Sequence, residues 1–172
     1  MKEKAYSYHS SIKPTDLVTL WRTSFIDAYH DVHSEDDIKK YLDEHYTLSE
    51  AERVVNSEAY ERIVARRDSN NVGVVIINKT SCPIGKYPKS YELKHLYLLA
   101  SEYGSGLGKE LLFKAMDLLR NKEQNSMWLC VSSRNKRAQK FYLKYGFREI
   151  GVGPQLVVGK DIFPSKIMIR EL

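Results

Sequence analysis

The stretch YELKHLYLLASEYGSGLGKELLFKAMDLLR, residues 91–120, decides the fold of the chain. A hydrophobic strand leads into a glycine-rich turn, and the turn leads directly into an amphipathic helix with Leu111, Ala115 and Met116 on its apolar face. At such a helix start the first backbone N–H groups are free, and the helix dipole adds partial positive charge at the same place. The stretch therefore predicts a strand-turn-helix unit that binds an anion, and phosphate suits it.

Length and composition indicate one domain, residues 1–172. The chain has 172 residues, 42% hydrophobic and 28% charged, enough to bury one ordinary core. It has no apolar run that could span a membrane and no charged-then-apolar leader, so we expect a cytoplasmic protein with no membrane partner. Cys82 and Cys130 lack partners at metal-ligand spacing, so we expect reduced thiols and no metal.

Charge is unevenly distributed along the chain. Residues 27–46 contain seven acids and two lysines, whereas residues 134–148 contain six basic residues and no acid. The pattern suggests one region for a cation and another for an anion, although each patch could equally be a solvated face. Aromatic residues are not interleaved with the basic run as a stacking platform requires, so we expect no nucleic-acid partner.

The rest of the chain predicts α/β order with a mixed sheet. Helix start signals are Pro14, Ser34 before Asp37, Ser49 before Glu52, and Asn135, and Gly146 is expected to end the last helix. Strand patterns cover residues 4–12, 62–67, 72–78, 91–98, 127–131, 147–152 and 166–170. The turn composition of residues 68–71 predicts a hairpin.

Two common phosphate-binding motifs do not fit the glycine turn. A Walker A loop needs Ser or Thr after Gly-Lys, but Glu110 follows Gly108-Lys109. A dinucleotide fingerprint needs a third glycine three residues after the second, and that position is Lys109. Both interpretations are excluded by spacing.

Two ordered motifs instead resemble the GNAT superfamily of N-acetyltransferases. Tyr103-Gly104-Ser105-Gly106-Leu107-Gly108 resembles the acetyl-CoA loop, Gln/Arg-x-x-Gly-x-Gly/Ala. The segment 135–147, NKRAQKFYLKYGF, resembles the family pattern Asn-x-x-Ala-x-x-x-Tyr-x-x-x-Gly-Phe. Within the superfamily, residues 23–29, 34–42 and 168–172 are similar to bacterial spermidine/spermine N-acetyltransferases.

The resemblance implies a mixed, mostly antiparallel central sheet that is splayed at its middle and flanked by helices. It also implies acetyl-CoA as co-substrate, with its pantetheine arm along the strand 96–98 and its phosphates at the glycine turn. The implied cofactor-binding residues are Leu96, Tyr97, Leu98, Gly104, Ser105, Gly106, Leu107, Gly108, Lys109, Asn135 and Lys144.

The chain departs from the family at the start of the loop. Relatives carry Gln or Arg at the position of Tyr103 and often a basic residue at Gly104 or Ser105. We therefore expect the phosphate charge to be met by backbone N–H groups and by nearby cations, namely Lys109, Arg134, Lys136, Arg137 and Lys144.

The implied reaction needs a polarised thioester carbonyl, a deprotonated amine and an acid for the departing thiolate. The resemblance makes the Leu98 N–H the donor to the carbonyl and Tyr142 the general acid, although Tyr142 could also be a core residue. Glu92 takes the position of the base in histone-type members and could equally be a sheet-edge carboxylate. Other members carry a glutamate where this chain has Cys130, and His30, His33 and His95 are reserve bases.

The expected acceptor is a small primary amine, with a polyamine favoured by the acidic region. Asp27, Tyr29 and Asp31 are the expected substrate residues, together with Glu35, Asp36 and Asp37, although the last two also suit a helix N-terminus. The alternatives are acetylation of a protein N-terminus or lysine, and a non-catalytic acyl-CoA-binding regulator. A homodimer is left open.

Overall fold

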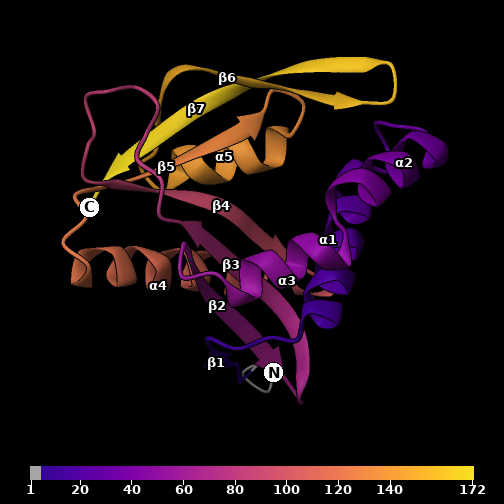
Figure 1. Cartoon of the computed structure of the whole chain (residues 1–172), viewed down its shortest axis with the longest axis horizontal. Coiled ribbons are helices and arrows are strands. Elements are labelled where there is room, and N and C mark those ends of the chain that lie inside the picture. The colour runs from indigo at the N-terminus through magenta and orange to yellow at the C-terminus, as the bar shows by residue number, and fades with distance from the viewer. Residues whose placement is uncertain (1–4) are drawn as a thin grey trace.

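A seven-stranded mixed sheet runs through the computed structural model, which describes residues 5–172 (Figure 1). The strands lie in the order β1-β2-β3-β4-β5-β7-β6, and every adjacent pair is antiparallel except β4 with β5. This confirms the predicted mixed, mostly antiparallel α/β fold. The strands are β1 Ser7–His9, β2 Tyr60–Arg67, β3 Asn70–Asn78, β4 Ser90–Leu98, β5 Ser126–Ser132, β6 Arg148–Val158 and β7 Asp161–Glu171.

The helices begin largely where the sequence predicts. They are α1 Pro14–Tyr29, α2 Glu35–His45, α3 Leu48–Asn56, α4 Leu107–Asn121 and α5 Lys136–Lys144, with a short 3-10 turn at Ala100–Glu102 that the pattern did not predict. The predicted cap at Ser49 is wrong. The hydroxyl of Thr47 accepts from the Glu50 N–H at 3.1 Å, so α3 begins earlier and Ser49 lies within its first turn.

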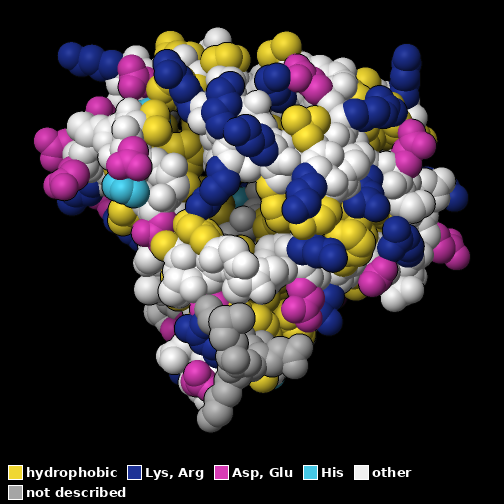
Figure 2. Space-filling model, turned by 180° about the vertical axis from the view of Figure 1, so that it is seen from behind, with side chains coloured by type: hydrophobic (Ala, Val, Ile, Leu, Met, Phe, Trp, Pro, Cys, Tyr) yellow, Lys and Arg dark blue, Asp and Glu magenta, His cyan; other side chains and the backbone are white. Residues whose placement is uncertain are grey.

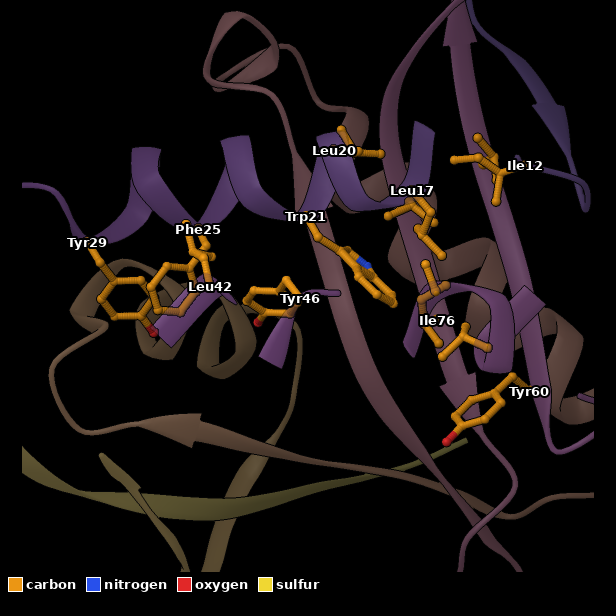
Figure 3. Packing of buried hydrophobic residues seen from close by; sticks show 14 of the residues in the cluster. Ile12, Leu17, Leu20, Trp21, Phe25, Tyr29, Leu42, Tyr46, Tyr60 and Ile76 are labelled. Carbon is orange, nitrogen blue, oxygen red and sulfur yellow. The ribbon is translucent and has the colours of Figure 1, made fainter. Parts of the chain in front are cut away.

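The helices cover opposite faces of the sheet. Along β3, Val74 and Ile76 pack with α1, α2 and α3, whereas Val75 and Ile77 pack with α4 on the other face. This alternation follows from the two-residue period of a strand, and β3 is buried on both faces for that reason. In Figure 3, Trp21, Phe25 and Tyr29 project from α1 into the first of these cores.

Two predicted strand boundaries are wrong. The β2–β3 turn is tighter than predicted, because Asp68 and Ser69 alone adopt positive φ (49° and 68°) and β3 already begins at Asn70. The final hairpin is longer than residues 147–152 and 166–170. Register shifts near Gly151 and Gly153 interrupt its alternation, which hid the pattern in the sequence.

The predicted first strand, residues 4–12, is only three residues long, Ser7–His9, and Lys4 lies outside the described residues. Among residues 5–172, no helix combines the length and apolar character needed to cross a membrane.

Strands β4 and β5 separate after a short parallel contact, as predicted. They pair only between Ser90–Glu92 of β4 and Ser126–Trp128 of β5, while β4 continues to pair with β3 as far as Leu98. Beyond the contact, the two strand ends diverge, and in the described part of the chain no other strand pairs with the edge that each turns toward the other. The candidate site lies in the gap between these two strand ends.

Candidate active site

A cavity of about 540 Å³ opens in the gap between β4 and β5. It extends from the C-terminal half of β4 to the start of α4, and α1 and α5 supply its walls. Eleven predicted site residues line it: Tyr29, Leu96, Tyr97, Leu98, Gly104, Gly106, Gly108, Lys109, Asn135, Tyr142 and Lys144. The fold therefore brings the two sequence motifs, separated by about 30 residues, to one cavity.

Hydrogen bonds within the turn and positive φ angles at its glycines fix the conformation of the glycine turn. Gly104 and Gly106 adopt φ of 77° and 91°, and a Cβ added to either would meet open space. The Ser105 hydroxyl donates to the Glu102 carbonyl at 2.7 Å and accepts from the Leu107 N–H at 3.2 Å. Among residues 5–172, no side chain caps α4 at Gly106, so the N–H groups of Gly108 and Lys109 remain available to a ligand.

A buried carboxylate anchors the turn to the sheet. Glu102 is 1% exposed, forms an ion pair with Arg67 of β2 and accepts a hydrogen bond from the Tyr6 hydroxyl at 2.5 Å. Hydrogen bonding to the charged form and the nearby cation satisfy a carboxylate in this position. Glu102 thus links the turn to β2 and to Tyr6, a stabilising role that the glycine pattern alone did not indicate.

Basic side chains surround the cavity mouth near the glycine turn. Lys109, Arg137 and Lys144 line the cavity, and Figure 2 shows Lys and Arg side chains gathered around the hollow in this face. The guanidinium of Arg137 lies 3.7 Å from the ring centroid of Tyr103. A cation from α5 is therefore placed over the turn residue where the family pattern has Gln or Arg.

Not all predicted cations gather there. Arg134 lies over the ring of Phe163 at 4.9 Å, and neither Arg134 nor Lys136 lines the cavity.

Tyr142 faces the cavity from α5. Its ring packs edge-on against Phe141 and Phe147, with centroids 5.4 Å away in each case. Burial raises the pKa of the Tyr142 phenol well above its ordinary value, and Tyr29 adds to the increase. The phenol therefore keeps its proton across the physiological pH range.

Asn135 connects α5 to the other wall of the cavity. Its Oδ1 accepts from the Ala138 N–H at 3.0 Å, which caps α5 as predicted, and its Nδ2 donates to the Tyr29 hydroxyl at 3.5 Å. The phenol of Tyr29 is thereby held at the cavity wall, and burial raises its pKa.

The backbone of Leu98 is directed into the gap. The Leu99 N–H donates to the Val72 carbonyl at 3.0 Å, so the neighbouring residue Leu98 has its polar groups on the opposite edge of β4. Its carbonyl accepts from the Ser24 hydroxyl of α1 at 3.1 Å. Its N–H lies on the same edge, toward the cavity.

Five predicted residues are not brought to the cavity lining. Glu92 lies in the paired part of β4 and accepts from the Asn78 side chain at 2.9 Å, while Leu107 is fully buried in the core. Asp27 accepts from the Ala100 N–H at 3.3 Å, and Asp31 is 86% exposed beside His30. Ser105 shapes the turn from outside the lining.

The cavity lining also includes residues that were not among the predicted site residues. Ser24 was missed because it shares the apolar face of α1, where a serine gives no signal of its own. His95 was a reserve base; burial and the Lys94 charge lower its pKa to about 3, so its ring is neutral and weakly basic. Burial also raises the pKa of Cys130 to about 11, so this thiol is protonated at neutral pH.

A mixed sheet that opens into a cavity ending at a glycine-capped helix is the fold of the N-acetyltransferases. Over 98% of the chain, the structure is similar to the PaiA N-acetyltransferase of Thermoplasma acidophilum, solved in complex with coenzyme A. The TM-score is 0.78 at 22% identity, and 99% of that chain is covered. Residues 19–147 match the acetyltransferase (GNAT) family, and the chain belongs to that family.

Other relatives agree on the family. Over 110 residues, 64% of this chain, the sequence is 30% identical to uncharacterised N-acetyltransferases of Mycobacterium bovis and Mycobacterium tuberculosis. The match spans 66% of each relative's own length, slightly less than two thirds. The ribosomal-protein-S18-alanine N-acetyltransferase of Escherichia coli has a TM-score of 0.66 at 15% identity, over 97% of this chain and 94% of that chain.

Proposed function

We propose that the chain is an acetyl-CoA-dependent N-acetyltransferase that acetylates a primary amine by direct attack on the thioester. The observation that carries the proposal is the convergence of the β4–β5 gap, the glycine turn and Tyr142 on one cavity. Family membership and the coenzyme A complex of the Thermoplasma relative support the same cofactor.

The residues present suit coenzyme A. The free N–H groups of Gly108 and Lys109 and the side chains of Lys109, Arg137 and Lys144 are proposed to hold the phosphates. The unpaired edge of β4 at Leu96 and Leu98 offers backbone groups to an amide-rich arm, much as a neighbouring strand would. When bound, the co-substrate supplies the activated acetyl thioester.

The chain's own groups then serve the transfer. The Leu98 N–H is proposed to donate to the thioester oxygen, and the Tyr142 phenol to protonate the departing sulfur. Glu92 is bonded to Asn78 outside the cavity lining, so we propose that water removes the amine proton rather than Glu92. Holding amine and thioester together supplies much of the rate.

A polyamine acceptor stays a prediction of the sequence. Its support was the acidic region, but Asp27 and Asp31 lie outside the cavity lining. Acetylation of a protein N-terminus is the second candidate, because the Escherichia coli structure is named as an N-acetyltransferase of an alanine in ribosomal protein S18.

Thiol release with a panel of amines tests the proposal. Mixing the protein with acetyl-CoA should release free coenzyme A only when an acceptor amine is present, and mass spectrometry should find the acetylated amine. Calorimetry with coenzyme A provides the binding control. Cofactor binding without thiol release from any amine or N-terminal peptide would favour the non-catalytic acyl-CoA-binding regulator.

A further inference from the structure

The end of the cavity under α1 is lined by rings and uncharged groups. Tyr29 comes from α1, His95 and Tyr97 from β4, and Cys130 and Ser132 from β5. The rings of His95 and Tyr97 are stacked, with centroids 5.0 Å apart and planes at 12°, and the Tyr97 hydroxyl bonds to the Tyr46 hydroxyl at 2.6 Å. This wall is fixed by its own packing before any ligand binds.

The aromatic wall continues behind the cavity. Trp21 and Phe25 of α1 lie beside Tyr46, with centroid distances of 5.6 Å in each case, and Figure 3 shows their rings next to one another. Tyr29 packs on Phe25 at 4.6 Å. The rings lining the cavity therefore rest on other rings, which makes this end rigid and apolar.

Among residues 5–172, the cavity lining holds a single carboxylate, and it does not belong to this end. The one acid in the lining, Glu102, belongs to the glycine turn and is paired with Arg67. Lys94 also lines the cavity; its Nζ lies 4.0 Å from Glu50 and 5.6 Å from the ring centroid of Tyr60, and its charge helps to lower the pKa of His95. His95 is uncharged because burial lowers its pKa to about 3.

We propose, on the basis of the proposed function, that the acceptor is a monoamine with an uncharged apolar body, best filled by an aromatic ring. Among residues 5–172, this end of the lining has no carboxylate, and burial there disfavours an ammonium relative to a free amine, so the site favours the nucleophilic form of the acceptor. A second ammonium on a polyamine would be buried without a partner at this end. The aromatic wall offers a planar body a large contact area instead.

A matched pair of substrates tests the charge requirement. Butylamine and putrescine have the same chain length and differ by one distal amine, and phenethylamine adds a ring. We expect kcat/KM in the thiol-release assay to be at least about tenfold higher for butylamine and phenethylamine than for putrescine and spermidine. Equal or higher values for the two polyamines overturn the inference.

Failure of the proposed function has a different signature. If the proposed function is wrong, no amine releases thiol from acetyl-CoA. The preference for an uncharged, aromatic ligand is then tested by measuring amine binding. Ligand-observed NMR with the coenzyme A-loaded protein should show phenethylamine binding and no spermidine binding. Spermidine binding, or no phenethylamine binding, overturns the inference in this case as well.

A variant provides an independent test. Ala28 of α1 lines the cavity, so Ala28→Asp introduces a carboxylate at the aromatic end. The putrescine-to-butylamine ratio of kcat/KM should rise about tenfold or more, because the second ammonium gains a partner. The control is Ile26→Asp on the exposed face of the same helix, where the side chain is 43% exposed. A ratio unchanged in a folded Ala28→Asp variant contradicts the inference.

Discussion

The hydroxyl of Ser24 donates a 3.1 Å hydrogen bond to the carbonyl oxygen of Leu98, 74 residues later in the chain. This bond ties α1 to β4 at the residue whose N–H is directed into the gap. Ser24 is only 2% exposed, so water does not replace the bond if the hydroxyl is removed. The orientation of the Leu98 peptide therefore depends on a side chain from a segment 74 residues earlier in the sequence.

We expect Ser24→Ala to lower kcat about tenfold while the affinity for coenzyme A changes little. A misdirected Leu98 N–H would stabilise the transition state less, whereas its effect on binding of the ground state would be small. Removing the hydroxyl also leaves the buried carbonyl unsatisfied, which should lower the free energy of unfolding by about 1–3 kcal/mol. Steady-state kinetics, calorimetry and urea unfolding measure the three quantities. Thr23→Ala, at the exposed neighbouring position, is the control, and an unchanged kcat in Ser24→Ala refutes the role.

Tyr142→Phe should reduce kcat about 100-fold or more, in the range found for general acids. The ring stays in contact with Phe141 and Phe147, so coenzyme A affinity and thermal stability should be nearly unchanged. Tyr145→Phe, at the C-cap of the same helix and lining the same cavity, is the matched control. Full activity in Tyr142→Phe would remove the phenol from the mechanism.

Arg137→Gln should weaken coenzyme A binding about 10-fold to 100-fold, because a charge-assisted contact to phosphate is lost. The salt dependence of the dissociation constant should also become shallower. Arg134→Gln, whose guanidinium lies over Phe163 away from the cavity lining, is the control. If Arg134→Gln weakens coenzyme A binding as much as Arg137→Gln, the position of Arg137 over Tyr103 makes no specific contribution to the affinity, and the prediction is contradicted.

The sequence predicted the elements that depend on local patterns. The cap at Asn135, the end of α5 at Gly146 and the turn before α4 follow from backbone geometry that few residues satisfy, so they were correctly located. The predicted cap at Ser49 failed because Thr47, an equally good cap, stands two residues earlier. A local rule identified the type of element but not the choice between two candidates.

Long-range placement was harder to predict. Acids in residues 27–37 were expected to form a substrate channel, but Asp27 is bonded to the Ala100 N–H and Asp31 lies in solvent. The contacts of Ser24 with Leu98 and of Arg137 with Tyr103 join distant segments and leave no periodic signal. The sequence therefore located the proposed cofactor end of the cavity better than the acceptor end.

The half-buried ring of His95 makes stability depend on pH. Its pKa is lowered to about 3, below the value of about 6.5 expected in the unfolded chain, so between these values the unfolded state binds more protons. Its contribution to stability is therefore present above pH 6.5 and is lost as the pH falls toward 3. His95→Phe, which retains a ring against Tyr97, should reduce the slope of unfolding free energy against pH in this window by up to about 1.4 kcal/mol per pH unit. An unchanged slope in urea titrations at several pH values contradicts this assignment.

Gly106→Val should abolish or strongly weaken coenzyme A binding. At φ of 91° a β-branched residue is strained, and the added side chain would project into the open space beside the free N–H groups of α4. We expect a loss of at least about 10-fold in affinity by calorimetry, because the turn must rearrange at a cost of about 1–3 kcal/mol. Gly85→Val is the control, since Gly85 has no positive φ and nothing within 4 Å of an added Cβ. Because strain alone could unfold the turn, Gly106→Ala is measured in parallel, and its affinity should lie between the wild type and Gly106→Val. Wild-type affinity in a folded Gly106→Val protein would show that the cofactor phosphates do not lie at this turn.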